Sequence, residues 1–122
     1  MQRDLLVLDQ MIAAAERAIA ISNQHGLSAL ADRPDPRDAL LWNMSVLGEA
    51  AGQLSTELRG SHPKLPWRQA IALRNRIVHG YWSIDLQVIH TTAKRDLPAF
   101  REQLALLRDE VSTSPDASGP ER

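Results

Sequence analysis

Apolar residues in the first half of the chain recur every three or four positions, the spacing that places them on one face of an α-helix. A first helix is predicted to end at the His25-Gly26 pair, because glycine readily adopts the left-handed conformation that terminates helices. The segment from Gly26 to Arg37 is predicted to be a connection. A second helix is predicted from about Pro36 to Leu58, ended by Gly60. The repeats are Leu5, Leu8, Ile12, Ala15 and Ile19 in the first helix, then Leu40, Met44, Leu47, Ala51, Leu54 and Leu58 in the second.

The second half predicts two more helices. The third covers about residues 67–79; Pro66 suits the start of a helix, and Gly80 ends it. The fourth is capped by Ser83 and continues to about Val111, with a kink or split at Pro98. Strand-like alternation is scarce, so the prediction is an all-α fold, an antiparallel bundle of four to five helices. Residues 1–111 are predicted to form one domain, and residues 112–122 a disordered tail without apolar periodicity.

Arg74 lies among the apolar residues of the predicted third helix. At about 100° per residue it falls within about 20° of Trp67, near the centre of the apolar side. A charge there needs a partner, because burying an ion costs several kcal/mol. The partner could be a structural carboxylate such as Glu49 or Asp85, or instead a ligand or a second subunit. His79 sits in the last turn, where its role could be limited to the helix dipole.

Charge is distributed unevenly along the chain. The net charge is −1, yet no acidic residue occurs between Glu57 and Asp85. Such a region can attract a phosphate backbone, although a solvated face with acids supplied by neighbouring helices is an equal alternative. The basic side chains of this segment are Arg59, His62, Lys64, Arg68, Arg74, Arg76 and His79.

Composition excludes several other classes of function. The chain has no cysteine, so disulfides, thiol nucleophiles and thiolate metal sites are ruled out. No apolar run approaches membrane-spanning length and the N-terminus does not resemble a signal peptide, so a cytoplasmic location is expected. Histidines and carboxylates do not occur at metal-ligand spacing, and there is no glycine-rich phosphate loop. Neither a metal nor a cofactor is predicted. The histidines are His25, His62, His79 and His90.

An arginine and a histidine near one helix end suggest phosphate chemistry. Histidine can move a proton to or from a ribose 2′-hydroxyl or a 5′-leaving oxygen, and arginine stabilises the charge that develops on a phosphate. These are the requirements of RNA cleavage without a metal. Because one Arg74 and one His79 make a small active site, a two-fold dimer that doubles the set is expected.

The stretch "RNRIVHGYW" resembles the R-x-x-x-x-H-x-Y motif of HepT-like toxins in the HEPN superfamily, with Arg74, His79 and Tyr81 at the motif positions. The similarity extends from about Arg3 to Leu107 and includes "LWNMSVLGEAAGQLS", "HPKLPWRQAIALRNRIVHGYWSID" and "RDLPAFREQL". It departs from the family at His90, where many relatives carry an aromatic residue. The resemblance implies a compact helical bundle that forms a homodimer, with the two motifs lining a cleft on the two-fold axis.

The resemblance also implies a function. It indicates a metal-independent endoribonuclease that acts as the toxin of a type II toxin-antitoxin pair. Arg74 would contact the scissile phosphate of the RNA substrate, His79 would be the general acid or base, and Asn75, Glu49 and Arg76 would be supporting residues. The expected partner is a minimal nucleotidyltransferase antitoxin that transfers AMP to Tyr81. The alternatives are a non-catalytic subunit that binds nucleotides or the nucleotidyltransferase, and a helical dimerisation domain in which the Arg74 pair is structural.

Overall fold

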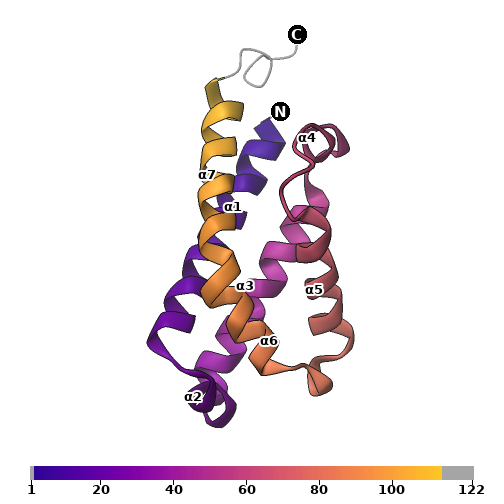
Figure 1. The fold of residues 1–122 in the computed structure, drawn as a ribbon. Helices are drawn as coiled ribbons and strands as arrows, with labels where there is room; N and C mark the ends of the chain where they lie inside the picture. Colours follow the sequence, from indigo (N-terminus) through magenta and orange to yellow (C-terminus); the bar gives the residue numbers. More distant parts are fainter. Residues whose placement is uncertain (1, 114–122) are drawn as a thin grey trace.

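The computed structural model describes residues 2–113, and its long helices form an antiparallel bundle (Figure 1). Helix α1 packs against α3 and α7, and α3 also packs against α5. The all-α prediction is therefore confirmed. Along the chain the elements are α1 (Gln2–Gln24), α2 (Leu27–Asp32), α3 (Pro34–Gln53), α4 (Thr56–Ser61), α5 (Trp67–His79), η1 (Tyr81–Ser83), α6 (Leu86–Thr91), η2 (Thr92–Asp96) and α7 (Leu97–Thr113).

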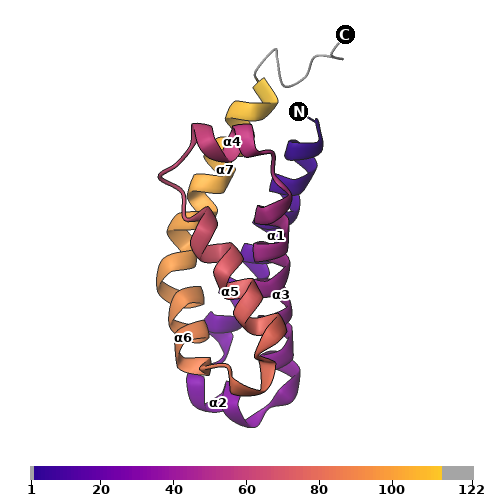
Figure 2. The same cartoon turned by 90° about the vertical axis from the view of Figure 1, so that its right-hand side faces the viewer.

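The apolar stripes predicted for the first two long helices face the core. Every member of the stripe from Leu40 to Leu58 is buried, and Leu8 and Ala15 of α1 are fully buried. The prediction for α5 is less accurate, because only Trp67 and Ile77 of that helix are buried and Val78 is 47% exposed. Helix α5 lies at the side of the bundle and meets mainly α3 (Figure 2).

The predicted second helix is broken into α3 and α4 at Leu54 and Ser55. Ser55 caps α4, since its hydroxyl accepts a hydrogen bond from the backbone N–H of Leu58 at 3.1 Å. The buried Asp4 of α1 fixes this cap: its carboxylate accepts the Ser55 N–H at 2.9 Å and the Ser55 hydroxyl at 2.7 Å. Predicting a continuous helix was wrong because this partner lies 51 residues away in sequence.

Details at three other helix ends differ from prediction, although α5 has its predicted bounds, 67–79. The connection from Gly26 to Arg37 contains the short helix α2, anchored by the fully buried Leu30, and α3 already begins at Pro34. Pro66 precedes the first residue of α5. Asp85, rather than Ser83, caps α6, since its side chain accepts the N–H of Gln87 at 3.0 Å.

Helix α6 runs into α7 through the π-helical turn η2, just before Pro98. In this wide turn the N–H of Leu97 bonds to the carbonyl of Thr92, five residues back. The predicted kink is thus a widened turn, which accommodates a proline that lacks a backbone donor. Helix α7 extends to Thr113, two residues past the predicted end, and the remaining positions of the predicted tail, 114–122, lie outside the described residues. Within residues 2–113, none of the helices has the length and apolarity needed to cross a bilayer.

Candidate active site

Arg74 emerges where α5 packs tightly against α3, at Gly48. A Cβ atom on Gly48 would lie 2.3 Å from Cβ of Arg74 and 2.4 Å from the carbonyl oxygen of Ala70. No side chain larger than hydrogen fits there unless the two helices move apart. Gly48 therefore sets the separation of α3 and α5 and, with it, the position of the Arg74 stem.

The guanidinium of Arg74 is held by Glu49 and Asn75. Its Nη2 lies 3.0 Å from Oε1 of Glu49, and its Nη1 donates to Oδ1 of Asn75 at 2.9 Å. Of the alternatives considered for Arg74, the ion pair with Glu49 forms, but it is not buried: the side chains of Arg74 and Glu49 are 30% and 53% exposed. Pairs this exposed usually contribute between about 0 and 1 kcal/mol. A phosphate could therefore exchange with the Glu49 carboxylate at little cost.

Exposed apolar side chains surround the head group of Arg74. Arg74 and Glu49 line a hollow of about 250 Å³ between α1, α3 and α5, together with Trp42 and Val78. Trp42 is 69% exposed, although it is one of the largest apolar side chains in the protein. Large apolar groups beside a charged site are typical of surfaces that another molecule covers.

His79 lies in a different hollow from Arg74. It is the last residue of α5, is exposed, and lines an open depression of about 390 Å³ with Asn75 and Arg76. Asn75 connects the two places, because it bonds to Arg74 and borders the His79 depression. Within one chain, then, the motif residues form a continuous polar surface along α5 but do not face one another across a shared cavity.

Tyr81 follows Gly80 in the turn η1, and its hydroxyl donates a hydrogen bond of 2.8 Å to Oδ1 of Asp38 on α3. This hydrogen bond is the main reason that the pKa of Tyr81 is raised above 10.0; lost hydration and the negative charge of Asp38 act in the same direction, and Arg37 opposes them. Sequence reasoning missed Asp38, because no spacing rule connects residues 43 positions apart.

His90 lies away from the motif. Its Nε2 is 3.3 Å from the carbonyl oxygen of Ser22, so it joins α6 to the end of α1. The side chain is half-buried there. The departure from the family pattern at this position therefore belongs to the packing of α6 and adds no polar group to the surface around Arg74.

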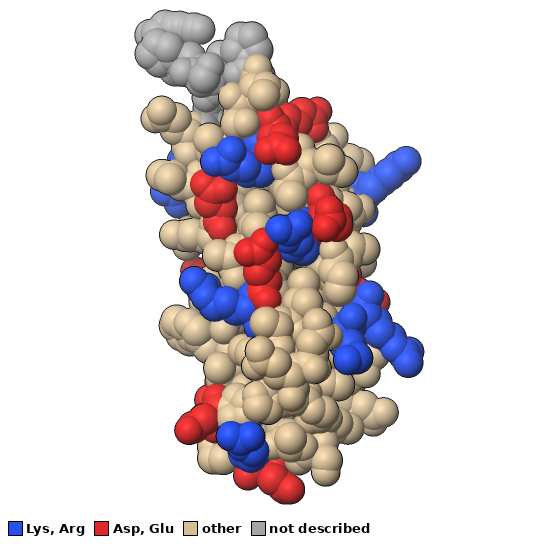
Figure 3. All heavy atoms as spheres, turned by 90° about the vertical axis from the view of Figure 1, so that its left-hand side faces the viewer, with Lys and Arg blue, Asp and Glu red and all other residues tan. Residues whose placement is uncertain are grey.

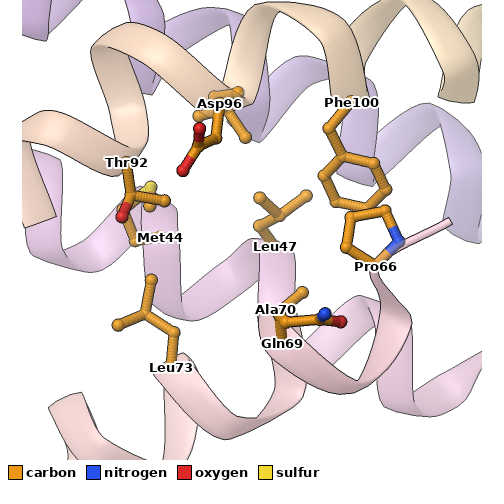
Figure 4. A pocket seen from close by; sticks show the side chains of 10 residues that line it. Met44, Leu47, Pro66, Gln69, Ala70, Leu73, Thr92, Asp96 and Phe100 are labelled. Atoms are coloured by element: carbon orange, nitrogen blue, oxygen red, sulfur yellow. The ribbon is translucent and has the colours of Figure 1, made fainter.

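A separate apolar hollow of about 270 Å³ lies between α3, α5, η2 and α7 (Figure 4). The π turn directs Thr92 and the Asp96 carboxylate into it, toward Met44. Neither a cationic side chain nor a histidine lines this hollow, so it has no means of binding and cleaving a phosphodiester. Across residues 2–113, no three His, Asp or Glu side chains gather as a set of metal ligands.

A helical bundle that carries R-x-x-x-x-H-x-Y at the end of one helix has the architecture expected of a HEPN protein. The chain belongs to the HepT-like ribonuclease family: the model of the family described as Ribonuclease HepT-like matches residues 11–107. The matched segment includes Gly48, Glu49, Arg74, His79 and Tyr81.

Similar proteins among curated sequences carry related names. The chain is 29% identical over 70 residues to a "Probable ribonuclease HepT" of Thermococcus cleftensis, an alignment that covers 57% of this chain and 64% of the relative. It is 27% identical over 71 residues to the "Putative RNase MJ1380" of Methanocaldococcus jannaschii. This alignment covers 58% of this chain and 65% of the relative. The alignments thus span just under two thirds of these relatives. No solved structure is significantly similar to the chain.

Proposed function

We propose that the protein is a metal-independent endoribonuclease in which Arg74 binds the scissile phosphate and His79 transfers a proton. The observation that carries the proposal is the placement of Arg74. Its stem is fixed against Gly48, its guanidinium is oriented by Glu49 and Asn75, and its side chain is 30% exposed, which leaves it accessible to an anion. Family membership and the relatives named as ribonucleases support RNA as the substrate.

The proposed reaction needs no group beyond those of the chain and the RNA. The ribose 2′-oxygen attacks phosphorus, the bond from phosphorus to the 5′-oxygen breaks, and a 2′,3′-cyclic phosphate forms. One proton leaves the 2′-hydroxyl and another is delivered to the 5′-oxygen. His79 acts as the acid or the base of this exchange, and Arg74 stabilises the negative charge on the phosphate oxygens.

A homodimer would complete this site. The hollow around Arg74 is bordered by the exposed side chains of Trp42 and Val78, and Trp82 of η1 is 84% exposed. A second copy that covers this surface would bury these groups and bring a second Arg74 and His79 to the two-fold axis. The second histidine could supply the other proton transfer, which a single His79 cannot perform at the same moment.

Neutralisation is proposed to occur at Tyr81. A minimal nucleotidyltransferase antitoxin would transfer AMP from ATP: the Tyr81 oxygen attacks the α-phosphorus, pyrophosphate leaves, and the phenolic proton passes to a base. The carboxylate of Asp38 accepts the Tyr81 hydrogen bond at 2.8 Å and could receive that proton. The added phosphate would repel RNA and compete with it for Arg74.

AMP transfer is tested by intact mass. We expect co-expression with the antitoxin to raise the intact mass by AMP units, and Tyr81→Phe to stay unmodified. An unchanged wild-type mass contradicts AMP transfer.

The substrate class is tested with matched RNA and DNA strands. Freshly purified protein, incubated in excess EDTA, is expected to cut a single-stranded RNA and leave the DNA of the same sequence intact, since DNA lacks the attacking 2′-hydroxyl. Equal cutting of both strands, or loss of cutting in EDTA, contradicts the proposal.

One observation favours a second function. Because Arg74 and His79 line different hollows in one chain, the same surface could bind a nucleotide or the nucleotidyltransferase without catalysis, as a non-catalytic HEPN subunit. Unmodified protein that binds RNA or the antitoxin but cuts no RNA would establish this alternative. For either function we expect the chain to act in the cytoplasm.

A further inference from the structure

A second group of cations lies at the other end of α5, away from the motif. An open hollow of about 380 Å³ between α4 and the start of α5 is lined by Arg59 and Arg68. Trp67 and Ile71 also line it, but Trp67 is only 6% exposed and Ile71 is half-buried, so charge is the main feature that the hollow offers a ligand. Figure 2 shows α4 lying beyond the N-terminal end of α5.

The two arginines of this hollow lack anionic partners within residues 2–113. No carboxylate of the described chain forms an ion pair with Arg59 or Arg68, and Nε of Arg59 is buried with no hydrogen-bond partner. A buried donor without an acceptor costs about 1–3 kcal/mol. Arg59 and Arg68 line the same hollow, so their positive charges add there. An anion in the hollow would balance that charge.

On the opposite face of the bundle, arginines have acidic partners. The arginines of α7 are matched with acids of α1, Arg108 with Asp9 at 2.8 Å and Arg101 with Glu16. Positive and negative side chains are accordingly interspersed on that face (Figure 3). Arg59 and Arg68 thus differ from Arg101 and Arg108, because no carboxylate of the described residues pairs with them.

The same side of α5 continues to the proposed active site. At about 100° per residue, Arg68, Asn75 and His79 fall within about 40° of one another around the helix. With a rise of 1.5 Å per residue, Arg68 and His79 are separated by about 16 Å along the axis. No acidic residue occurs in sequence between Glu57 and Asp85, so the surface between these points carries no carboxylate from α5.

We propose that Arg59, Arg68, Asn75 and His79 form a track for one strand of RNA, with the Arg59–Arg68 hollow binding a backbone phosphate a few nucleotides from the bond that is cut. The inference rests on the proposed ribonuclease function and extends it. A single strand fits better than a duplex because the track is one helix wide. The hollow makes the enzyme favour substrates long enough to reach it.

The test compares two double variants that remove the same charge. Arg59→Gln with Arg68→Gln is expected to weaken binding of a long single-stranded RNA by roughly tenfold for each arginine. The slope of log K against log salt should become shallower by about 0.7 for each phosphate that the variant no longer neutralises. Cleavage of a dinucleotide substrate, which is too short to reach the hollow, should keep its wild-type kcat/KM. The control, Arg17→Gln with Arg95→Gln on α1 and η2, should bind and cleave like wild type.

Arg59 is half-buried, so a loss of affinity in the double variant could come from a change in folding. Arg68 is exposed, and Arg68→Glu therefore serves as a second variant. Its affinity for the long RNA should fall below that of Arg68→Gln, with an unchanged melting temperature. Wild-type affinity for long RNA in Arg68→Glu, or equal losses on the dinucleotide and the long RNA, would overturn the track. If wild-type protein cuts no RNA but the double variant and Arg68→Glu both lose affinity for long RNA, the ribonuclease proposal fails and the track stands.

Discussion

Nη2 of Arg74 lies 3.0 Å from Oε1 of Glu49, and both side chains are accessible to solvent. Structural and functional roles for Arg74 predict different effects of substitution. Since an exposed pair contributes at most about 1 kcal/mol, Arg74→Met should change the free energy of unfolding in urea by no more than that. RNA cleavage should fall by about 10²–10³ because transition-state charge is left unstabilised. Wild-type cleavage combined with a large loss of stability would identify Arg74 as a structural residue.

The tight packing of α3 against α5 at Gly48 predicts that a larger residue there will move the two helices apart. Gly48→Ala places a methyl group against Arg74 and the Ala70 carbonyl, so α5 must shift. We expect a loss of about 1–3 kcal/mol in the free energy of unfolding, together with reduced RNA cleavage as Arg74 is displaced.

The matched control for this change is Gly52→Ala, on the same helix. A Cβ atom there would meet only Ile71, at 4.0 Å, an ordinary van der Waals contact. Replacing a helical glycine by alanine should stabilise by about 0.5–1 kcal/mol. Equal stabilities of the two variants would disprove the close approach at Gly48.

The hydrogen bond from Tyr81 to Asp38 can be followed by its effect on pKa. Because it raises the pKa of Tyr81, Asp38→Asn should lower that pKa toward its ordinary value. Tyr81 is the only tyrosine in the chain, so the phenolate absorbance in a pH titration reports it alone. Wild-type protein should ionise at higher pH than Asp38→Asn. Asp35→Asn, on the same helix, should titrate like wild type; identical curves for all three proteins would exclude the bond.

The proposed dimer predicts a difference between two equally exposed apolar residues. Trp42 beside Arg74 and Leu106 on α7 are each 69% exposed. If the second copy covers the Arg74 hollow, Trp42→Glu should convert the dimer to a monomer in sedimentation experiments, because a carboxylate would be buried in the interface. Leu106→Glu should remain dimeric. A monomeric wild-type protein, or a dimer that survives Trp42→Glu, contradicts this interface.

Much of the fold could be predicted from local sequence. The stripe from Leu40 to Leu58 is buried as its period indicates, and α5 has the predicted bounds. The break at Ser55 could not be predicted, since it depends on the buried Asp4, which lies 51 residues away in sequence. Helix α2 was missed because one buried leucine, Leu30, leaves no periodic signal.

The candidate site was likewise predicted only in part. Arg74, His79 and Tyr81 lie on one short segment, which sequence identified, and Glu49 was among the carboxylates considered for Arg74. Helical periodicity placed Arg74 at the centre of a buried side, whereas its head group is accessible because α5 packs mainly on α3. Asp38 is brought to Tyr81 only by the packing of the turn η1 against α3. The sequence therefore predicted the motif residues, but it could not predict their contacts with distant segments of the chain.

RNA cleavage by His79→Ala in excess EDTA is the sharpest single test of the proposed ribonuclease. Single-turnover rates of wild type and variant are compared on one RNA, with the folded state and oligomeric size of each checked beforehand. We predict that wild-type protein cuts in EDTA and that His79→Ala is slower by about 10²–10⁴, the usual contribution of a general acid or base. Cleavage by His79→Ala at the wild-type rate would contradict the proposed role of His79 and, with it, the ribonuclease mechanism.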